Sequence, residues 1–195
     1  KANGEKISVA ADKVLLSIGR RSNCMGIGLE NIGVEIDRGV PTDTRGRTNV
    51  PGVYAIGDVN GHHMLAHTAY REAEVAVNTI LGKKDYMRYS ANPSVIYTMP
   101  EVASVGLTEQ ECKEKGIAVE IKKLSMMYSG RFVAENEGET GLCKVIVDER
   151  SKAILGVHMI GNPCSEFVAA ASFAVRMGYT VGEFKQVVFP HPTVA

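Results

Sequence analysis

The sequence predicts an α/β segment followed by an α+β domain built on an antiparallel sheet. Before residue 88, short apolar runs that end in glycine precede one long helical pattern, which is typical of a parallel or mixed sheet with a covering helix. After residue 88, short strand-like runs separated by turns alternate with capped helices. We therefore place a domain boundary near residue 88.

The first segment begins with an apolar run at residues 12–18 that is closed by Gly19. A short apolar run of this kind predicts a strand that is buried on both faces. Residues 20–47 are rich in glycine and asparagine and predict mostly loop, with a small strand at 34–36 and a turn at 37–39.

A second buried strand is expected at residues 53–58, where an apolar run ends in Gly57 and Asp58. A helix should follow, because apolar residues then recur at three- and four-residue spacing. These residues are Ala66, Ala69, Ala73, Ala76, Val77, Ile80 and Leu81. Gly82 lies where a C-cap glycine belongs.

The second domain should contain five antiparallel strands and several helices. The expected strands are residues 94–98, 102–105, 119–124, 142–147 and 153–160. Two helices are announced by capping boxes, Thr108 with Glu111 and Thr180 with Glu183. Between these two, residues 164–177 predict a helix that is apolar over much of its surface.

Composition excludes several classes of protein. The 22 basic and 22 acidic residues give a net charge of zero, so nothing favours nucleic acid or an anionic membrane as a partner. A small neutral substrate or another protein fits better. The apolar stretches are shorter than the roughly 20 residues that cross a bilayer, so we expect no membrane span. The polar start at Lys1, without an initiating methionine, suggests a cut inside a longer chain.

The four cysteines have no paired spacing, which argues against a disulfide framework or a zinc site. They are Cys24, Cys112, Cys143 and Cys164. We expect small apolar residues, packed or half-exposed, in a protein of a reducing compartment such as the cytoplasm.

Asp58 is the first candidate for a binding residue. It stands at the carboxyl end of an expected strand, where α/β sheets bind ligands, and Gly57 would let a ligand approach the backbone. A carboxylate there can accept hydrogen bonds from a polyol. Asp58 could equally be a helix N-cap or a turn residue.

Histidines supply the other candidates. His191 lies between Pro190 and Pro192, which restrict the backbone and aim the imidazole, and a histidine is the natural proton carrier at neutral pH. It could also be structural. His62, His63 and His67 are close in sequence, but no cysteine or acid completes a ligand set at helical spacing, so we expect no metal site.

The segment from Thr48 to Asp58, together with Met64-Leu-Ala-His67, resembles the second flavin fingerprint of the disulfide oxidoreductase flavoproteins. The resemblance implies that Asp58 holds the ribityl hydroxyls of FAD. It also implies that Met64, Leu65, Ala66 and His67 lie beneath the flavin pyrimidine ring. The start of a helix suits that place, because its free amides and partial positive charge stabilise negative charge on a reduced flavin.

Residues 17–23, Ser-Ile-Gly-Arg-Arg-Ser-Asn, resemble the strand that closes the nicotinamide-binding domain of this family. Gly19 would then approach NAD, whereas Arg20 and Arg21 are either ligands or a solvated basic turn. The resemblance divides the chain into three parts. These are the end of an NAD-binding domain (1–19), the C-terminal segment of a Rossmann-like FAD-binding domain (20–87) and a dimerisation domain (88–195).

Residues 100–106, 128–136, 156–161 and 189–193 resemble the dimerisation domain of dihydrolipoamide dehydrogenases. The resemblance implies a homodimer in which His191 crosses to the partner subunit and acts as acid and base for a dithiol substrate on a lipoyl domain. Such enzymes serve 2-oxoacid dehydrogenase or glycine cleavage complexes. Glutathione reductase, mercuric reductase and soluble transhydrogenase share these features and remain alternatives, as does a dimerisation module that binds no ligand.

Three features of the intact enzymes are not found in the chain. It contains no Cys-x-x-x-x-Cys pair, no Gly-x-Gly-x-x-Gly turn, and no acid after His191 that could orient the imidazole. We therefore expect no turnover by this polypeptide alone and weak or no retention of FAD.

Overall fold

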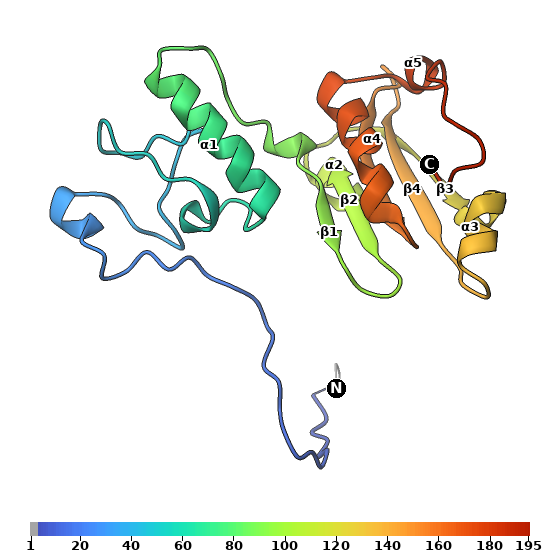
Figure 1. The fold of residues 1–195 in the computed structure, drawn as a ribbon, viewed down its shortest axis with the longest axis horizontal. Coiled ribbons are helices and arrows are strands. Elements are labelled where there is room, and N and C mark those ends of the chain that lie inside the picture. The colour runs from blue at the N-terminus through green and yellow to red at the C-terminus, as the bar shows by residue number, and fades with distance from the viewer. Residues whose placement is uncertain (1–3) are drawn as a thin grey trace.

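The computed structural model describes residues 4–195 (Figure 1). An extended N-terminal segment leads into a first part that surrounds helix α1, and a second part is built on one five-stranded sheet (Figure 1). No helix of residues 4–195 is long and apolar enough to cross a membrane.

The first part contains one long helix and two short 3-10 helices. Its elements are η1 (Leu29–Ile32), η2 (Gly57–Asn60) and α1 (Ala66–Ile80), and η3 (Tyr89–Ala91) begins the second part, where it packs against α4 and β2. A small core lies under its loops and contains Cys24, Val34, Val40 and Ala55. The prediction of mostly loop over residues 20–47 is confirmed.

All three predicted strands of the first part are wrong. Residues 12–18 are exposed and pair with no other segment of residues 4–195. A strand needs a neighbour to accept and donate its backbone hydrogen bonds, so an apolar run alone stays extended. Residues 53–58 form a single bridge between Tyr54 and Arg47, and the left-handed Gly57 (φ 73°) then turns the chain into η2. The small strand at 34–36 is also absent from the described fold.

Helix α1 forms where the spacing predicts it, and Gly82 follows it in the left-handed conformation (φ 73°). Its buried face differs from the predicted apolar stripe. The buried residues are Thr68, Glu72, Val75 and Ala76. Val77, Ile80 and Leu81 are instead more than half exposed.

The second part confirms the predicted antiparallel sheet, whose strands run in the order β1-β2-β5-β4-β3. Their bounds are β1 Ser94–Ile96, β2 Val102–Gly106, β3 Val119–Ser125, β4 Leu142–Asp148 and β5 Ile154–Ile160. All neighbouring pairs are antiparallel. The helices of this part are α2 (Glu109–Glu114), α3 (Gly130–Glu135), α4 (Cys164–Met177) and α5 (Val181–Phe184). Both predicted capping boxes form, at Thr108 and Thr180.

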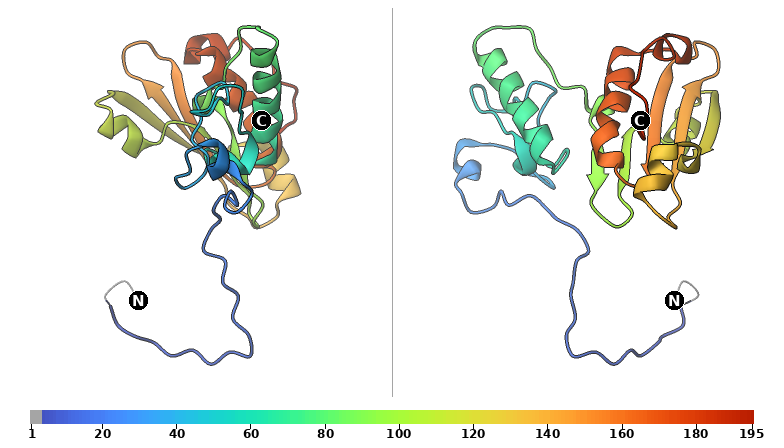
Figure 2. Two further views of the ribbon diagram at one scale, coloured as in Figure 1. Left: turned by 90° about the vertical axis from the view of Figure 1, so that its left-hand side faces the viewer. Right: turned by 45° about the vertical axis from the view of Figure 1, so that its right-hand side comes forward.

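Helix α4 lies across one face of the sheet, against β2 and β5 (Figure 2). The core between them is apolar and includes Val105, Val157, Met159, Val168 and Ala174. Helix α3, which the sequence analysis did not predict, adds the fully buried Phe132 to this core.

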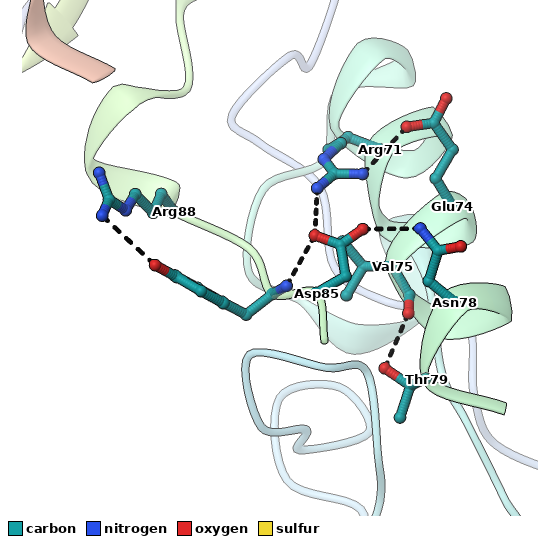
Figure 3. A network of polar contacts seen from close by, with 8 residues as sticks. Arg71, Glu74, Val75, Asn78, Thr79, Asp85 and Arg88 are labelled. Carbon is teal, nitrogen blue, oxygen red and sulfur yellow. Dashed lines mark hydrogen bonds and ion pairs between the residues drawn. The ribbon is translucent and has the colours of Figure 1, made fainter. Parts of the chain in front are cut away.

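The loop after α1 is tied to that helix by Asp85 (Figure 3). Its carboxylate pairs with Arg71, accepts from the Asn78 amide at 2.8 Å and accepts from the Tyr86 backbone N–H at 2.8 Å. The Arg71 guanidinium is the main cause that lowers the pKa of Asp85 to about 2. Arg88 then donates to the carbonyl of Arg176 at 3.0 Å, which links this loop to the end of α4.

Candidate functional site

Asp58 lies in a short turn at the surface of the first part. It is exposed, and no hydrogen bond or ion pair reaches its carboxyl group within residues 4–195. The backbone beneath it is fixed, because the Ser22 hydroxyl donates to the Asp58 carbonyl at 2.6 Å and Gly57 is buried in a left-handed conformation. The turn therefore exposes a carboxyl group that has no protein partner among residues 4–195, on a backbone whose conformation is fixed by these contacts.

The start of α1 packs beside this turn. Leu65 occupies the N-cap position in extended conformation and supplies no side-chain cap. The first backbone amides of the helix thus lack a side-chain acceptor, and they carry the positive end of the helix dipole. Ala66 and His67 are exposed, whereas Met64 and Leu65 are half-buried. The structure packs η2, which contains Asp58, against α1, which begins directly after Met64 and Leu65.

Glu72, which was not predicted from the sequence, holds the two elements together. Its carboxyl group is buried, with the residue only 2% exposed. One oxygen accepts the backbone N–H of Gly57 at 2.6 Å, and the other accepts the hydroxyl of Tyr89 at 2.7 Å. The signal that could have found it is the four-residue spacing from Thr68, which puts both on one face of α1.

Tyr89 belongs to η3, and its side chain is half-buried. Burial, followed by the hydrogen bond to Glu72, raises the pKa of the Tyr89 phenol well above its ordinary value. The phenol therefore keeps its proton at all ordinary pH values and remains a donor to Glu72.

The three histidines near the site each contact protein groups. His62 lies 3.1 Å from the Thr42 hydroxyl, and His67 lies 2.8 Å from the carbonyl of Pro93. The His63 ring stacks on Tyr89, with 5.4 Å between ring centroids. Burial, and then the neighbouring His62, lowers the pKa of His63. Residues 4–195 contain no group of three or more His, Cys, Asp or Glu side chains that could hold a metal ion.

Gly19 lies in the extended N-terminal segment with φ 132°, and nothing surrounds the position that a Cβ would take. Arg20 and Arg21 are exposed beside it. The described structure therefore places no other site residue against Gly19.

His191 is exposed, on a C-terminal tail that folds over the sheet of its own chain. The Ser129 hydroxyl donates to the carbonyl of Thr193 at 2.9 Å, and Val194 packs against the core of the second part. The ring of His191 has no hydrogen bond within residues 4–195. The tail lies over β3 and β4, far from α1 (Figure 1), so one copy does not bring His191 and Asp58 together.

A largely apolar cavity of about 680 Å³ lies between the tail, the sheet and α4. His191 is at its edge, together with Tyr128 and Arg131. Met159, Phe167 and other side chains of the core line its interior.

The four cysteines are free, as predicted, and three of them are buried. Burial raises the pKa of Cys112, Cys143 and Cys164. A raised pKa disfavours the thiolate, so these thiols are poor nucleophiles. They fit the predicted role as small apolar residues.

Two family profiles match the chain. "Pyridine nucleotide-disulphide oxidoreductase, dimerisation domain" covers residues 92–195, and "Pyridine nucleotide-disulphide oxidoreductase" covers residues 1–73.

Curated relatives cover nearly the whole chain. Dihydrolipoyl dehydrogenase of Chlamydia muridarum is 45% identical over 186 residues, which are 94% of this chain and 40% of that protein. The mitochondrial dihydrolipoyl dehydrogenase of Caenorhabditis elegans is 39% identical over 195 residues, or 99% of this chain and 39% of that protein. The chain thus spans about 40% of the length of these relatives.

Solved structures share the fold. LpdA from Mycobacterium tuberculosis superposes with a TM-score of 0.84 at 26% identity, over 92% of this chain and 40% of that one. The Cu(II) complex of the flavoprotein disulfide reductase RclA from Escherichia coli gives 0.85 at 22% identity, over 97% of this chain and 44% of that one.

Proposed function

This chain belongs to the pyridine nucleotide-disulphide oxidoreductase family, and from that premise we propose that it is the C-terminal part of a dihydrolipoyl dehydrogenase. The whole enzyme would oxidise dihydrolipoamide with NAD+ through a redox disulfide and FAD. The observation that carries the proposal is the match to dihydrolipoyl dehydrogenases at 39–45% identity over nearly all residues.

The described residues fit FAD. Asp58 offers a carboxyl group without a protein partner, on a turn where Gly57 adopts a conformation that side chains disfavour. Asp58 would hold the ribityl hydroxyls, and the uncapped start of α1 at Met64 to His67 would face the pyrimidine ring. When bound, FAD supplies the two-electron chemistry between a dithiol and a nicotinamide.

The protein residues provide the proton chemistry. His191 is exposed and its ring nitrogens are unpaired among residues 4–195, so the ring can take a proton from a substrate thiol and later return it. Removing that proton yields the thiolate, which is the reactive form of sulfur. Gly19 would contact the nicotinamide of NAD.

The site would be completed in a homodimer. His191 and Asp58 lie at separate places in one copy, and a dimer with twofold symmetry would let the tail of one copy serve the flavin side of the other. The partners beyond the dimer would be lipoyl domains of a 2-oxoacid dehydrogenase or glycine cleavage complex. The free thiols fit a reducing compartment, and we expect the cytoplasm.

A turnover assay on the whole enzyme tests this function. We expect reduction of NAD+ by dihydrolipoamide, and no oxidation of NADH or NADPH by glutathione disulfide. Preference for glutathione disulfide would assign the chain to a glutathione reductase instead. The 195-residue chain alone should be inactive with either substrate, because it contains no Cys-x-x-x-x-Cys pair.

A further inference from the structure

A polar network connects the Asp58 turn to the start of the second part of the chain. At its centre the buried Glu72 joins Gly57, which precedes Asp58, to Tyr89, which belongs to η3. Helix η3 in turn packs against α4, where the Ser172 hydroxyl donates to the carbonyl of Ala91 at 2.8 Å.

A second set of contacts also connects α1 and the loop before it to residues 92 and 93. The Asn92 amide donates to the fully buried Thr68 hydroxyl at 2.7 Å and lies 3.3 Å from the His63 ring. The His67 ring lies 2.8 Å from the carbonyl of Pro93. Residues 89–93 therefore contact α1 at several points and contact the loop before it at His63.

The buried backbone N–H of Gly57 needs a strong hydrogen-bond acceptor. It is buried at the bend that aims Asp58, and a buried amide without an acceptor is costly. A Cβ at Gly57 would come within 3.2 Å of the Ala69 Cβ, so the bend is also pressed against α1. A carboxyl oxygen at 2.6 Å fixes both the amide and the bend.

We infer that Glu72 is a positioning residue for flavin binding. It sets the Asp58 turn, and Tyr89 at the start of the second part holds Glu72 in place. The inference rests on the proposed function of Asp58. It makes flavin affinity depend on residues of η3, although η3 itself would not contact the flavin.

The test is an NMR titration of the 195-residue chain with FAD, since amide shifts report weak binding as well as local structure. In the wild type, the amides of Asp58, Ala66 and His67 should shift with added FAD. In Glu72→Ala the Gly57 amide should move to higher field, and the FAD dissociation constant should rise by roughly ten-fold.

Conservative variants separate positioning from general packing. In Glu72→Gln the amide oxygen still accepts from Gly57 and the NH2 group donates to the Tyr89 oxygen, so affinity should stay within about two-fold of the wild type. Tyr89→Phe removes one hydroxyl and should weaken FAD by about three-fold, even if Glu72→Ala fails to fold. Glu74→Ala, on the exposed side of the same helix, is the matched control.

The inference is overturned if Glu72→Ala binds FAD like Glu74→Ala, if Glu72→Gln is as weak as Glu72→Ala, or if Tyr89→Phe binds like the wild type. Absence of any FAD-dependent shift in the wild type would instead count against the proposed role of Asp58. In that case the amide shifts of Gly57 and Asp58 in the variants, without FAD, still test the inference. If these shifts are the same in Glu72→Ala as in the wild type, the positioning role is refuted. If Glu72→Ala does not fold, the same comparison is made with Tyr89→Phe.

Discussion

Replacing Asp85 by Asn should destabilise the fold in a pH-dependent way. In the native chain, the Arg71 guanidinium first and the Asn78 amide second lower the pKa of Asp85 from 3.8 to about 2. That difference corresponds to about 2.5 kcal/mol, since one pKa unit is worth about 1.4 kcal/mol. Arg71 is 39% exposed, so solvent screening reduces the effect and we expect about 1–2 kcal/mol.

The sign follows from the lowered pKa. The stabilisation is fully present above the unfolded pKa of 3.8 and is lost as the pH falls through the folded pKa of about 2. The wild type should therefore be more stable than Asp85→Asn near neutral pH, and the difference should shrink steadily below about pH 4.

Urea denaturation followed by circular dichroism measures this difference at a series of pH values. Asp37→Asn is the control, because the Asp37 carboxyl has no hydrogen bond or ion pair within residues 4–195. Equal stability of wild type and Asp85→Asn near neutral pH, or a difference that does not change down to about pH 2, would refute the reasoning.

Three further predictions concern packing and thiol reactivity. Phe132→Ala should cost about 3–5 kcal/mol in urea denaturation, against less than about 1 kcal/mol for its exposed neighbour Val133→Ala, and similar losses would contradict the proposed core. Gly106→Ala should destabilise far more than Gly138→Ala. Both glycines have positive φ, but only at Gly106 would the new Cβ meet a carbonyl oxygen at 2.1 Å, so equal melting temperatures would exclude that close contact. On brief alkylation, mass spectrometry should find the half-buried Cys143 labelled before the three buried cysteines, and earlier labelling of a buried one would contradict the described burial.

The second part of the fold could be predicted from the sequence because its signals are local. Alternation and turns gave all five strands, and the capping boxes at Thr108 and Thr180 gave the starts of two helices. Helix α3 was missed because it has only six residues and depends on the Ser129 cap and on the burial of Phe132. The Ser129 cap is a local signal, whereas the burial of Phe132 follows from tertiary packing rather than from spacing.

The first part was predicted less well because its signals depend on partners. The apolar run at 12–18 has strand composition, but no segment of residues 4–195 pairs with it. Helix α1 was predicted in its place and length, yet the buried carboxyl of Glu72 lies on its inner face and Val77 is exposed. Polarity alone suggested that Val77 faces the core and Glu72 faces solvent, since a charged residue is rarely buried unless it is paired.

The candidate site likewise contains some features that the sequence predicts and others that only the structure reveals. Asp58 and Met64 to His67 could be picked from their order along the chain, and the structure packs η2, which contains Asp58, against α1. The Glu72 to Tyr89 contact joins residues 17 positions apart through a turn and could not be read from spacing. The roles of Asp58, of Met64 to His67, of Gly19 and of His191 all stay predictions.

Mixed dimers test the central proposal most directly. In the whole enzyme, His191→Gln and Asp58→Ala would each inactivate their own homodimer. Random mixing of the two inactive proteins should restore about a quarter of wild-type turnover, because half of the dimers are mixed and each holds one intact site made from both copies. Mixtures that stay inactive while forming mixed dimers would show that His191 does not serve the Asp58 site of its partner.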